Sequence, residues 1–237
     1  MDDRRTIDFG RIEVLTFDCY GTLIDWEAGI AAALRGVLGT ATNRLSDDEL
    51  LALYGAEEAA IEGGRWLPYR AVLAHTVTAV GRRIGRTPTA GEAADFAASI
   101  GEWPPFPDSV DSLRRLGGRF ALGVITNCDD DLFAASNRHL GEPFRWVITA
   151  ERAGAYKPSL RNFALALKAI GRPADRIMHV AQSLYHDHVP AAACGLATAW
   201  IDRRRGRPGS GATPPAVASP DITSPDLAGF AELALAA

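Results

Sequence analysis

The sequence predicts an α/β fold, with a Rossmann-like, doubly wound parallel sheet as its core and an inserted helical domain. Short apolar runs rich in β-branched residues alternate with helix-like stretches along most of the chain. This alternation is typical of a parallel sheet covered on both faces. One long region interrupts it with helical periodicity alone. We therefore expect a core of residues 1–25 and 104–237, with a helical insertion at residues 26–103.

Five apolar runs are the predicted strands of the core. They are Val14–Phe17, 120–126, Trp146–Thr149, Ile177–Ala181 and Ala197–Ile201. In doubly wound sheets, ligands bind outside the carboxyl ends of the strands. Asp18, Thr126 and residues 182–187 lie at or just past such ends. We expect these residues to share one edge of the sheet.

The insertion is predicted to contain four amphipathic helices, because its apolar residues recur at steps of three and four. These helices are residues 30–38, 47–61, 69–84 and 90–100. Ser46 followed by Glu49 is a capping-box pattern at the start of the second helix. The proline-rich residues 104–107 form a stiff return to the core, so a hinge is expected near Asp25 and Pro104.

The chain after the fifth strand changes in composition. Residues 203–224 are rich in Arg, Gly, Pro, Ser and Ala, which predicts an extended surface loop. A short helix over residues 226–235 follows. The segment Gly209-Ser210-Gly211 is not a phosphate-binding P-loop, because no Gly-Lys-Ser/Thr follows it.

Composition and charge exclude several classes of protein. With 237 residues, 47% of them hydrophobic, the chain can bury a full-sized core. A net charge of -4 argues against nucleic acid as the main partner. No apolar stretch approaches the ~20 residues that span a bilayer, and the charged residues 1–5 lead into no signal sequence, so we expect a cytoplasmic protein without membrane partners.

Three cysteines, Cys19, Cys128 and Cys194, lie far apart without C-x-x-C spacing. This pattern indicates neither a disulfide framework nor a zinc site, and favours small buried side chains. A homodimer is compatible with the sequence.

Asp18 is the strongest candidate for chemistry. It ends the first apolar run, and Gly21 and Thr22 follow it in a predicted turn. A carboxylate held there by turn amides and a hydroxyl is suited to act as a covalent nucleophile, with Thr22 orienting it. The alternatives are an Asp that caps a turn and an ordinary threonine at a helix start.

Three later segments follow Asp18 in a recognisable order. They are Thr126-Asn127-Cys128-Asp129, then Tyr156-Lys157-Pro158, then residues 182–187. An acid at the first strand end, a hydroxyl and amide pair, a lysine and a final acid resemble the haloacid dehalogenase superfamily. The resemblance covers nearly the whole chain, and the helical insertion occupies the position of that family's cap domain.

The residue two positions after Asp18 indicates a branch of this superfamily. Its phosphatases carry D-x-D-x-T, whose second Asp protonates the leaving alcohol, whereas this chain has Tyr20. The D-x-Y-G-T-L form is similar to the type II 2-haloacid dehalogenases. The resemblance implies a hydrolase acting on carbon–halide bonds that converts an (S)-2-haloacid to a 2-hydroxy acid through an aspartyl ester, without metal or cofactor.

Leaving-group chemistry supports this branch. An alkoxide benefits from general acid catalysis of ~10²–10⁴, whereas a halide is a weak base that leaves without a proton. Tyr20 is a poor replacement for a carboxylic acid, although it can contact the substrate. The expected partner is a small 2-substituted carboxylate, and losing one acid makes Mg²⁺ binding less favourable.

The resemblance assigns roles to the remaining motif residues. Lys157 keeps the nucleophile ionised, Asp187 positions the hydrolytic water with Ser183 beside it, and Thr126 and Asn127 bind the substrate carboxylate or the departing halide. Each role has a structural alternative: a solvated lysine, a helix cap and a strand-end turn.

His186 and His188 flank Asp187 but lack the helical spacing of a metal pair, and the resemblance gives them no role. Either one is chemically suited to act as a general base near neutral pH.

The family's cap carries a halide-binding arginine, and residues 54–60 contain none. Arg65 and Arg70 are the candidates to replace it. Three cap aromatic residues, Trp26, Trp66 and Tyr69, are candidates to line an apolar pocket, although such residues in helices are more often core packing.

Two rival functions remain open on the sequence. One is a Mg²⁺-dependent phosphatase acting on a small phosphate ester. The other is a binding protein built on a catalytically inactive enzyme fold. Asp18, Lys157 and Asp187 together weigh against the second rival.

Overall fold

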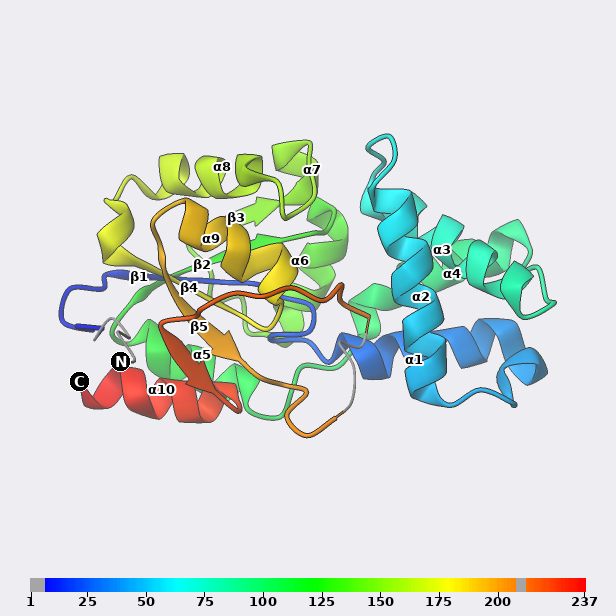
Figure 1. The fold of residues 1–237 in the computed structure, drawn as a ribbon, viewed down its shortest axis with the longest axis horizontal. Coiled ribbons are helices and arrows are strands. Elements are labelled where there is room, and N and C mark those ends of the chain that lie inside the picture. The colour runs from blue at the N-terminus through cyan, green and yellow to red at the C-terminus, as the bar shows by residue number, and fades with distance from the viewer. Residues whose placement is uncertain (1–6, 208–211) are drawn as a thin grey trace.

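The computed structural model describes residues 7–207 and 212–237, and it has a sheet core and a group of helices to one side (Figure 1). Residues 1–5 and the segment 209–211, considered above, lie outside the described residues. The sheet has the order β3-β2-β1-β4-β5-β6, and each neighbouring pair is parallel. The strands are β1 (Val14–Phe17), β2 (Ala121–Thr126), β3 (Trp146–Thr149), β4 (Ile177–Ala181), β5 (Ala197–Ile201) and β6 (Ile222–Ser224).

Helices cover both faces of the sheet (Figure 1). On one face lie α8 (Leu160–Ile170) and α9 (Val189–Ala193), and on the other lie α5 (Ser109–Gly117) and α10 (Leu227–Ala236). Two further helices, α6 (Asp130–His139) and α7 (Ala150–Ala153), follow β2 and β3. The predicted α/β fold class is confirmed.

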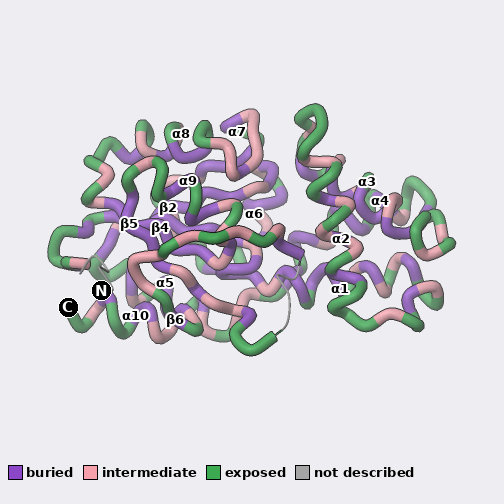
Figure 2. Tube along the Cα trace, in the orientation of Figure 1, coloured by how far each residue is buried: buried purple, intermediate pink, exposed green. Residues whose placement is uncertain are grey.

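The strands form where the apolar runs predict them because a parallel sheet is buried on both faces. All residues of β1 and β4 are buried, and Figure 2 shows burial concentrated along the sheet. Phe17, the last residue of β1, pairs with Val124 of β2 and Val180 of β4. The order of the strands therefore places Asp18 between the carboxyl ends of β2 and β4.

The four cap helices are α1 (Trp26–Leu38), α2 (Asp47–Glu62), α3 (Tyr69–Arg83) and α4 (Ala90–Ala98). The capping box of α2 is confirmed, since the Ser46 N–H donates to Glu49 Oε2 at 2.8 Å and the Glu49 N–H to Ser46 Oγ at 3.3 Å. Helix α1 begins four residues earlier than predicted. Asp25 caps it by accepting from the Ala28 N–H at 3.2 Å, a local bond that apolar periodicity does not reveal.

The two chain segments that join cap to core run side by side. The Asp25 N–H donates to the Pro104 carbonyl at 2.8 Å, and Ile24 forms an antiparallel bridge with Pro105. The two linkers between core and cap therefore lie next to each other, at the place where the sequence predicts a hinge.

The prediction of a simple surface loop over residues 203–224 is wrong in two respects. Its end forms β6, a three-residue strand that pairs with β5 and is too short to show a period. The start of this segment is also partly buried, because the Arg204 side chain is 9% exposed and bonds Glu27 of α1 at 2.5 Å. Contacts with other parts of the chain, rather than local composition, decide both features.

The three cysteines are free thiols; Cys19 and Cys128 are buried, and Cys194 is half-buried. Among the described residues, no helix combines the length and apolarity needed to cross a membrane.

Candidate active site

The turn after β1 holds Asp18 in place. The Leu23 N–H donates to the Cys19 carbonyl at 2.7 Å, and Gly21 has a φ of 90°. A side chain at Gly21 would be strained at that φ, and its Cβ would lie 2.8 Å from Trp26 Nε1. The turn brings the Thr22 hydroxyl to Asp18 Oδ2, to which it donates at 2.6 Å.

Lys157 joins the ends of three strands. Its ammonium donates to Asp18 Oδ1 at 2.8 Å, to Asp187 Oδ1 at 2.7 Å and to the Ile125 carbonyl at 2.9 Å. The lysine side chain is 2% exposed, so these bonds act in a water-poor environment where they are strong. The cation and the two predicted acids therefore form one buried ion-pair cluster.

Charge and burial oppose one another in this cluster. Burial acts to raise the pKa of Asp187, but Lys157 and His179 outweigh it and hold the pKa below its usual value. Burial likewise acts to lower the pKa of Lys157, and the two aspartates raise it instead. For Asp18 burial prevails, so its pKa is raised despite Lys157. The lysine is thus firmly cationic, and Asp18 is the more basic carboxylate.

The Asn127 side chain is hydrogen-bonded to the backbone of Lys157 and so positions the lysine. Its Oδ1 accepts from the Lys157 N–H at 2.7 Å, and its Nδ2 donates to the Lys157 carbonyl at 3.2 Å. Thr126 is fully buried, and its Oγ1 has no hydrogen-bond partner among the described residues. It does not line the cavity described below, so a direct contact of Thr126 with substrate does not fit this arrangement.

Residues 184–188 form one π-helical turn after β4. The Ser183 hydroxyl caps it by accepting from the His186 N–H at 2.9 Å. His186 lines the cavity, whereas His188 is turned away and pairs with the Ala181 carbonyl at 2.9 Å. Burial lowers the pKa of each imidazole to about 4. Both histidines are therefore neutral at physiological pH, and only His186 can meet a substrate.

The Tyr20 hydroxyl is engaged within the protein. It lies 2.9 Å from Ser136 Oγ, which donates onward to the Ile100 carbonyl at 3.3 Å, and it accepts from Cys128 Sγ at 3.5 Å. Burial raises the pKa of Tyr20 well above its ordinary value. Tyr20 lines the cavity, but the hydrogen bonds of its hydroxyl are made with Ser136 and Cys128.

A cavity of about 40 Å³ lies between core and cap, enough for a few water molecules. The core contributes Asp18, Tyr20, Asn127, Lys157, Ser183, His186, Asp187 and Thr213, and the cap contributes Trp26, Glu58, Glu62 and Tyr69. The structure thus brings together most of the residues that the sequence singles out. Among the described residues, no group of three or more His, Cys, Asp or Glu side chains is arranged to hold a metal ion.

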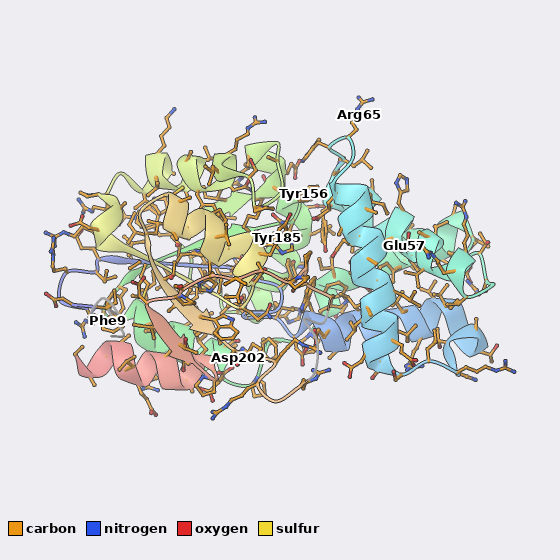
Figure 3. The ribbon with its side chains drawn as sticks, in the orientation of Figure 1. Phe9, Glu57, Arg65, Tyr156, Tyr185 and Asp202 are labelled. Carbon is orange, nitrogen blue, oxygen red and sulfur yellow. The ribbon has the colours of Figure 1, made fainter. Side chains whose placement is uncertain are left out.

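Three cap predictions do not fit this cavity. Trp66 is 38% exposed and lines a separate outer pocket beside Tyr156. Arg70 donates from Nη2 to Asp131 at 2.7 Å on the surface, with 47% of its side chain exposed. Arg65 points away from the core at the tip of the cap (Figure 3). Neither arginine replaces the expected halide-binding arginine, because neither lines the cavity.

A model of the haloacid dehalogenase-like hydrolase family matches residues 12–195. This chain belongs to that family. The match takes in β1, the cap and the ends of β2 and β4 at the cavity, but not Thr213 after β5.

Several known proteins are similar to this haloacid dehalogenase-like hydrolase. The (S)-2-haloacid dehalogenase of Pseudomonas putida is 30% identical over 106 residues, which are 43% of this chain and 46% of that protein. The match thus spans about half of that relative. The (S)-2-haloacid dehalogenase of Pseudomonas sp. (strain YL) is 24% identical over 200 residues, covering 81% of this chain and 83% of the relative.

The L-2-haloacid dehalogenase structure from Xanthobacter autotrophicus superposes on this hydrolase with a TM-score of 0.79. The identity is 19%, and the superposition covers 94% of this chain and 98% of that structure. The two proteins share a fold.

Sequence reasoning missed His179, a positioning residue in the hydrolase. It is fully buried in β4, with Nδ1 2.9 Å from Thr16 Oγ1 and Nε2 2.9 Å from Asp187 Oδ1. A single imidazole inside an otherwise apolar strand was the available signal. The other oxygen of Asp187, Oδ2, is buried without a hydrogen-bond partner among the described residues.

Sequence reasoning also missed Glu58 and Glu62 on α2. Their spacing of four residues puts both carboxyl groups on one face of the helix, but only the packing of the cap on the core shows that this face lines the cavity of the hydrolase.

Proposed function

We propose that this hydrolase is an (S)-2-haloacid dehalogenase-like enzyme that converts a small 2-haloacid to a 2-hydroxy acid through an ester on Asp18. The observation that supports it most is the placement of Asp18, held by Thr22 and Lys157 at the wall of a small cavity. The Xanthobacter autotrophicus fold relative has also been solved with chloropropionic acid covalently bound. No external cofactor is required by this chemistry.

In the first step, an Asp18 oxygen attacks the carbon that bears the halogen. The new C–O bond forms as the carbon–halogen bond breaks, and the halide takes the electron pair. Lys157 keeps Asp18 ionised, and the Thr22 hydroxyl fixes the carboxylate plane. Such positioning supplies much of the rate in substitutions of this kind.

In the second step, water attacks the carbonyl carbon of the ester and releases the 2-hydroxy acid. The unpartnered Asp187 Oδ2 is suited to accept a hydrogen bond from that water. His179 and Lys157 hold Asp187 through its other oxygen, Oδ1. Ser183 and the neutral His186 complete the wall on this side.

One experiment tests the nucleophile, the reaction and its stereochemistry together. The protein is incubated with each enantiomer of 2-chloropropionate without added metal, while chloride release and the mass of the Asp18 peptide are followed. We expect chloride from the (S) enantiomer and a transient mass increase on Asp18.

The Asp18→Asn variant is the control and should release no chloride. Absence of chloride from both enantiomers would contradict the proposal. Phosphate release from small esters that EDTA abolishes would instead favour a Mg²⁺-dependent phosphatase. A biological role that survives Asp18→Asn without any adduct would favour a binding protein.

A further inference from the structure

The cap presents an acidic wall to the cavity in which Asp18 lies. Glu58 and Glu62 both line this cavity from α2. Glu62 also lines the outer pocket, together with Lys157 and His186. It therefore stands between the reacting carboxylate and the route to solvent.

The two cap carboxyl groups differ in their partners. Glu58 is 7% exposed, and its Oε1 accepts from the hydroxyls of Tyr54 and Tyr69, each at 2.7 Å. Burial raises the pKa of Glu58, and the hydrogen bonds from the two hydroxyls oppose this shift without cancelling it. Glu62 makes no hydrogen bond within the described part of the chain, so its carboxyl group is available to a ligand.

Two of the other polar groups that line the cavity, the Tyr20 hydroxyl and the Lys157 ammonium, are already engaged within the protein. The Tyr20 hydroxyl is hydrogen-bonded to Ser136, and the lysine ammonium uses its three N–H groups on Asp18, Asp187 and Ile125. No arginine is among the residues that line the cavity. The halide-binding group of the cap must therefore be something other than arginine.

We propose that Glu62 is the acid of the leaving group, donating a hydrogen bond and then a proton to the departing atom. This inference rests on the proposed dehalogenation at Asp18. The substrate class that needs such an acid is the 2-fluoro acids, because fluoride is the most basic halide and its departure depends most on a proton donor. Bromide and chloride leave without such help.

The atoms balance as follows. Asp18 forms its bond to carbon, the carbon–fluorine bond breaks, and fluorine departs with the bonding electrons and the Glu62 proton. Glu62 is left as a carboxylate. Hydrolysis of the ester consumes one water and yields the hydroxy acid and a proton, which returns Glu62 to its acid form through the outer pocket.

The surroundings of Glu62 favour the protonated form that this role needs. Burial raises the pKa of Glu62 well above its ordinary value, the like charge of Glu58 raises it further, and Lys157 opposes both. The titratable and charged groups around Glu62 are Tyr54 and Glu58 of α2, Tyr69 of α3, and Asp18, Tyr156, Lys157, His186 and Asp187 of the core. The tyrosines and the imidazole are neutral at pH 7, because burial raises the pKa of each phenol and lowers the pKa of His186 to about 4.

The test compares halogens in the Glu62→Gln variant. Rates of halide release are measured for 2-fluoro-, 2-chloro- and 2-bromopropionate by the unmodified protein and the variant. Glutamine keeps the shape but has no acidic proton, so fluoride release should fall ~10²-fold or more, while bromide release changes little. In the unmodified protein, fluoride release alone should also decline as pH rises and Glu62 loses its proton.

Glu57→Gln is the matched control, because Glu57 lies on the same helix but bonds Arg83 at 2.8 Å, away from the core (Figure 3). Its halogen profile should match that of the unmodified protein. Equal losses for all three halogens in Glu62→Gln, or none, would overturn the role of Glu62 and leave the dehalogenase intact. Release of bromide and chloride but no fluoride by the unmodified protein would also overturn the role of Glu62 and leave the dehalogenase intact. Absence of halide from every substrate would overturn both proposals.

Discussion

Lys157 is the residue on which the site most depends, because one ammonium satisfies two buried acids and a strand-end carbonyl. Such a cluster stabilises the fold only while it is complete, since a buried charge without its partner is costly. The proposed catalytic role and the stability of the fold therefore depend on the same side chain.

Replacing Lys157 with methionine should abolish halide release and lower the free energy of unfolding by about 3–5 kcal/mol at neutral pH. The reason is that Asp18 and Asp187 then face each other without a cation. Urea unfolding measures the loss. The matched control is Lys168→Met, because Lys168 is exposed and is the only other lysine of the chain.

The pH dependence of this loss has a definite sign. In the unmodified protein the pKa of Asp187 lies below its ordinary value, so its stabilising effect is present above the ordinary pKa and is lost as pH falls through the lowered one. Without Lys157 the same acids bind protons more readily. The destabilisation by Lys157→Met should therefore shrink as pH falls from neutral, and a constant difference across that range would contradict this account.

His179 is expected to act through Asp187 rather than on the substrate. In His179→Phe, Asp187 loses a hydrogen bond at 2.9 Å that favours its ionised form, so ester hydrolysis should slow more than ester formation. Mass spectrometry should show the Asp18 adduct accumulating, with the acid limb of turnover moved to higher pH. A loss confined to substrate binding, without adduct, would indicate a different role.

At the scale of elements, helix α2 contributes two of the four cap residues that line the cavity. It supplies Glu58 and Glu62 to the cavity, and at Gly55 it touches the backbone of the segment after β5. A Cβ at Gly55 would lie 2.6 Å from the Ala212 carbonyl oxygen. The glycine therefore permits a close approach that sets how the cap lies on the core.

Gly55→Ala should lower the free energy of unfolding by about 1–3 kcal/mol, as overpacking against backbone does, and should reduce halide release by displacing α2. Gly36→Ala in α1 is the matched control, because its Cβ would meet nothing within 4 Å. That change should raise stability by about 0.5–1 kcal/mol through helix propensity. Thermal and urea unfolding measure the stability of both variants. A change of stability in the same direction in Gly55→Ala and Gly36→Ala would contradict the packing argument.

At the scale of the molecule, core and cap are joined by the paired linkers and by an ionic contact. Arg204 in the segment after β5 bonds Glu27 at the start of α1, and both side chains are largely buried. Arg207 adds bonds to Glu27 at 3.1 Å and to Asp48 at 3.0 Å. These contacts tie the segment after β5 to helices α1 and α2 of the cap.

Glu27→Gln should loosen the cap while leaving the sheet intact, because Arg204 and Arg207 lose their ion pairs with Glu27, whereas their ion pairs with Asp48 remain. Hydrogen exchange should become faster for the amides of α1 and α2 and stay unchanged in β1 and β4. Glu13→Gln is the control, since Glu13 pairs with Arg172 at 3.0 Å on the exposed side of the core. Faster exchange throughout the chain would indicate global destabilisation instead.

Much of the fold was predictable because its signals are local. Strands buried on both faces are continuous apolar runs, and four of the five predicted strands have the observed bounds. The capping box of Ser46 and Glu49 is likewise local. β6 could not be found this way, because three residues show no period and the strand exists only through its pairing with β5.

The residues of the candidate site likewise fall into those that local sequence signals predict and those that only packing reveals. Asp18, Thr22, Lys157 and Asp187 follow strand ends in a recognisable order, and parallel strands bring their carboxyl ends to one edge. The sequence by itself determined this core constellation and the α/β class. Only the tertiary structure decided that Arg65 and Arg70 lie outside the cavity and that Glu58 and Glu62 line it. The face that a helix turns toward another domain depends on interdomain packing, which periodicity within the helix does not specify.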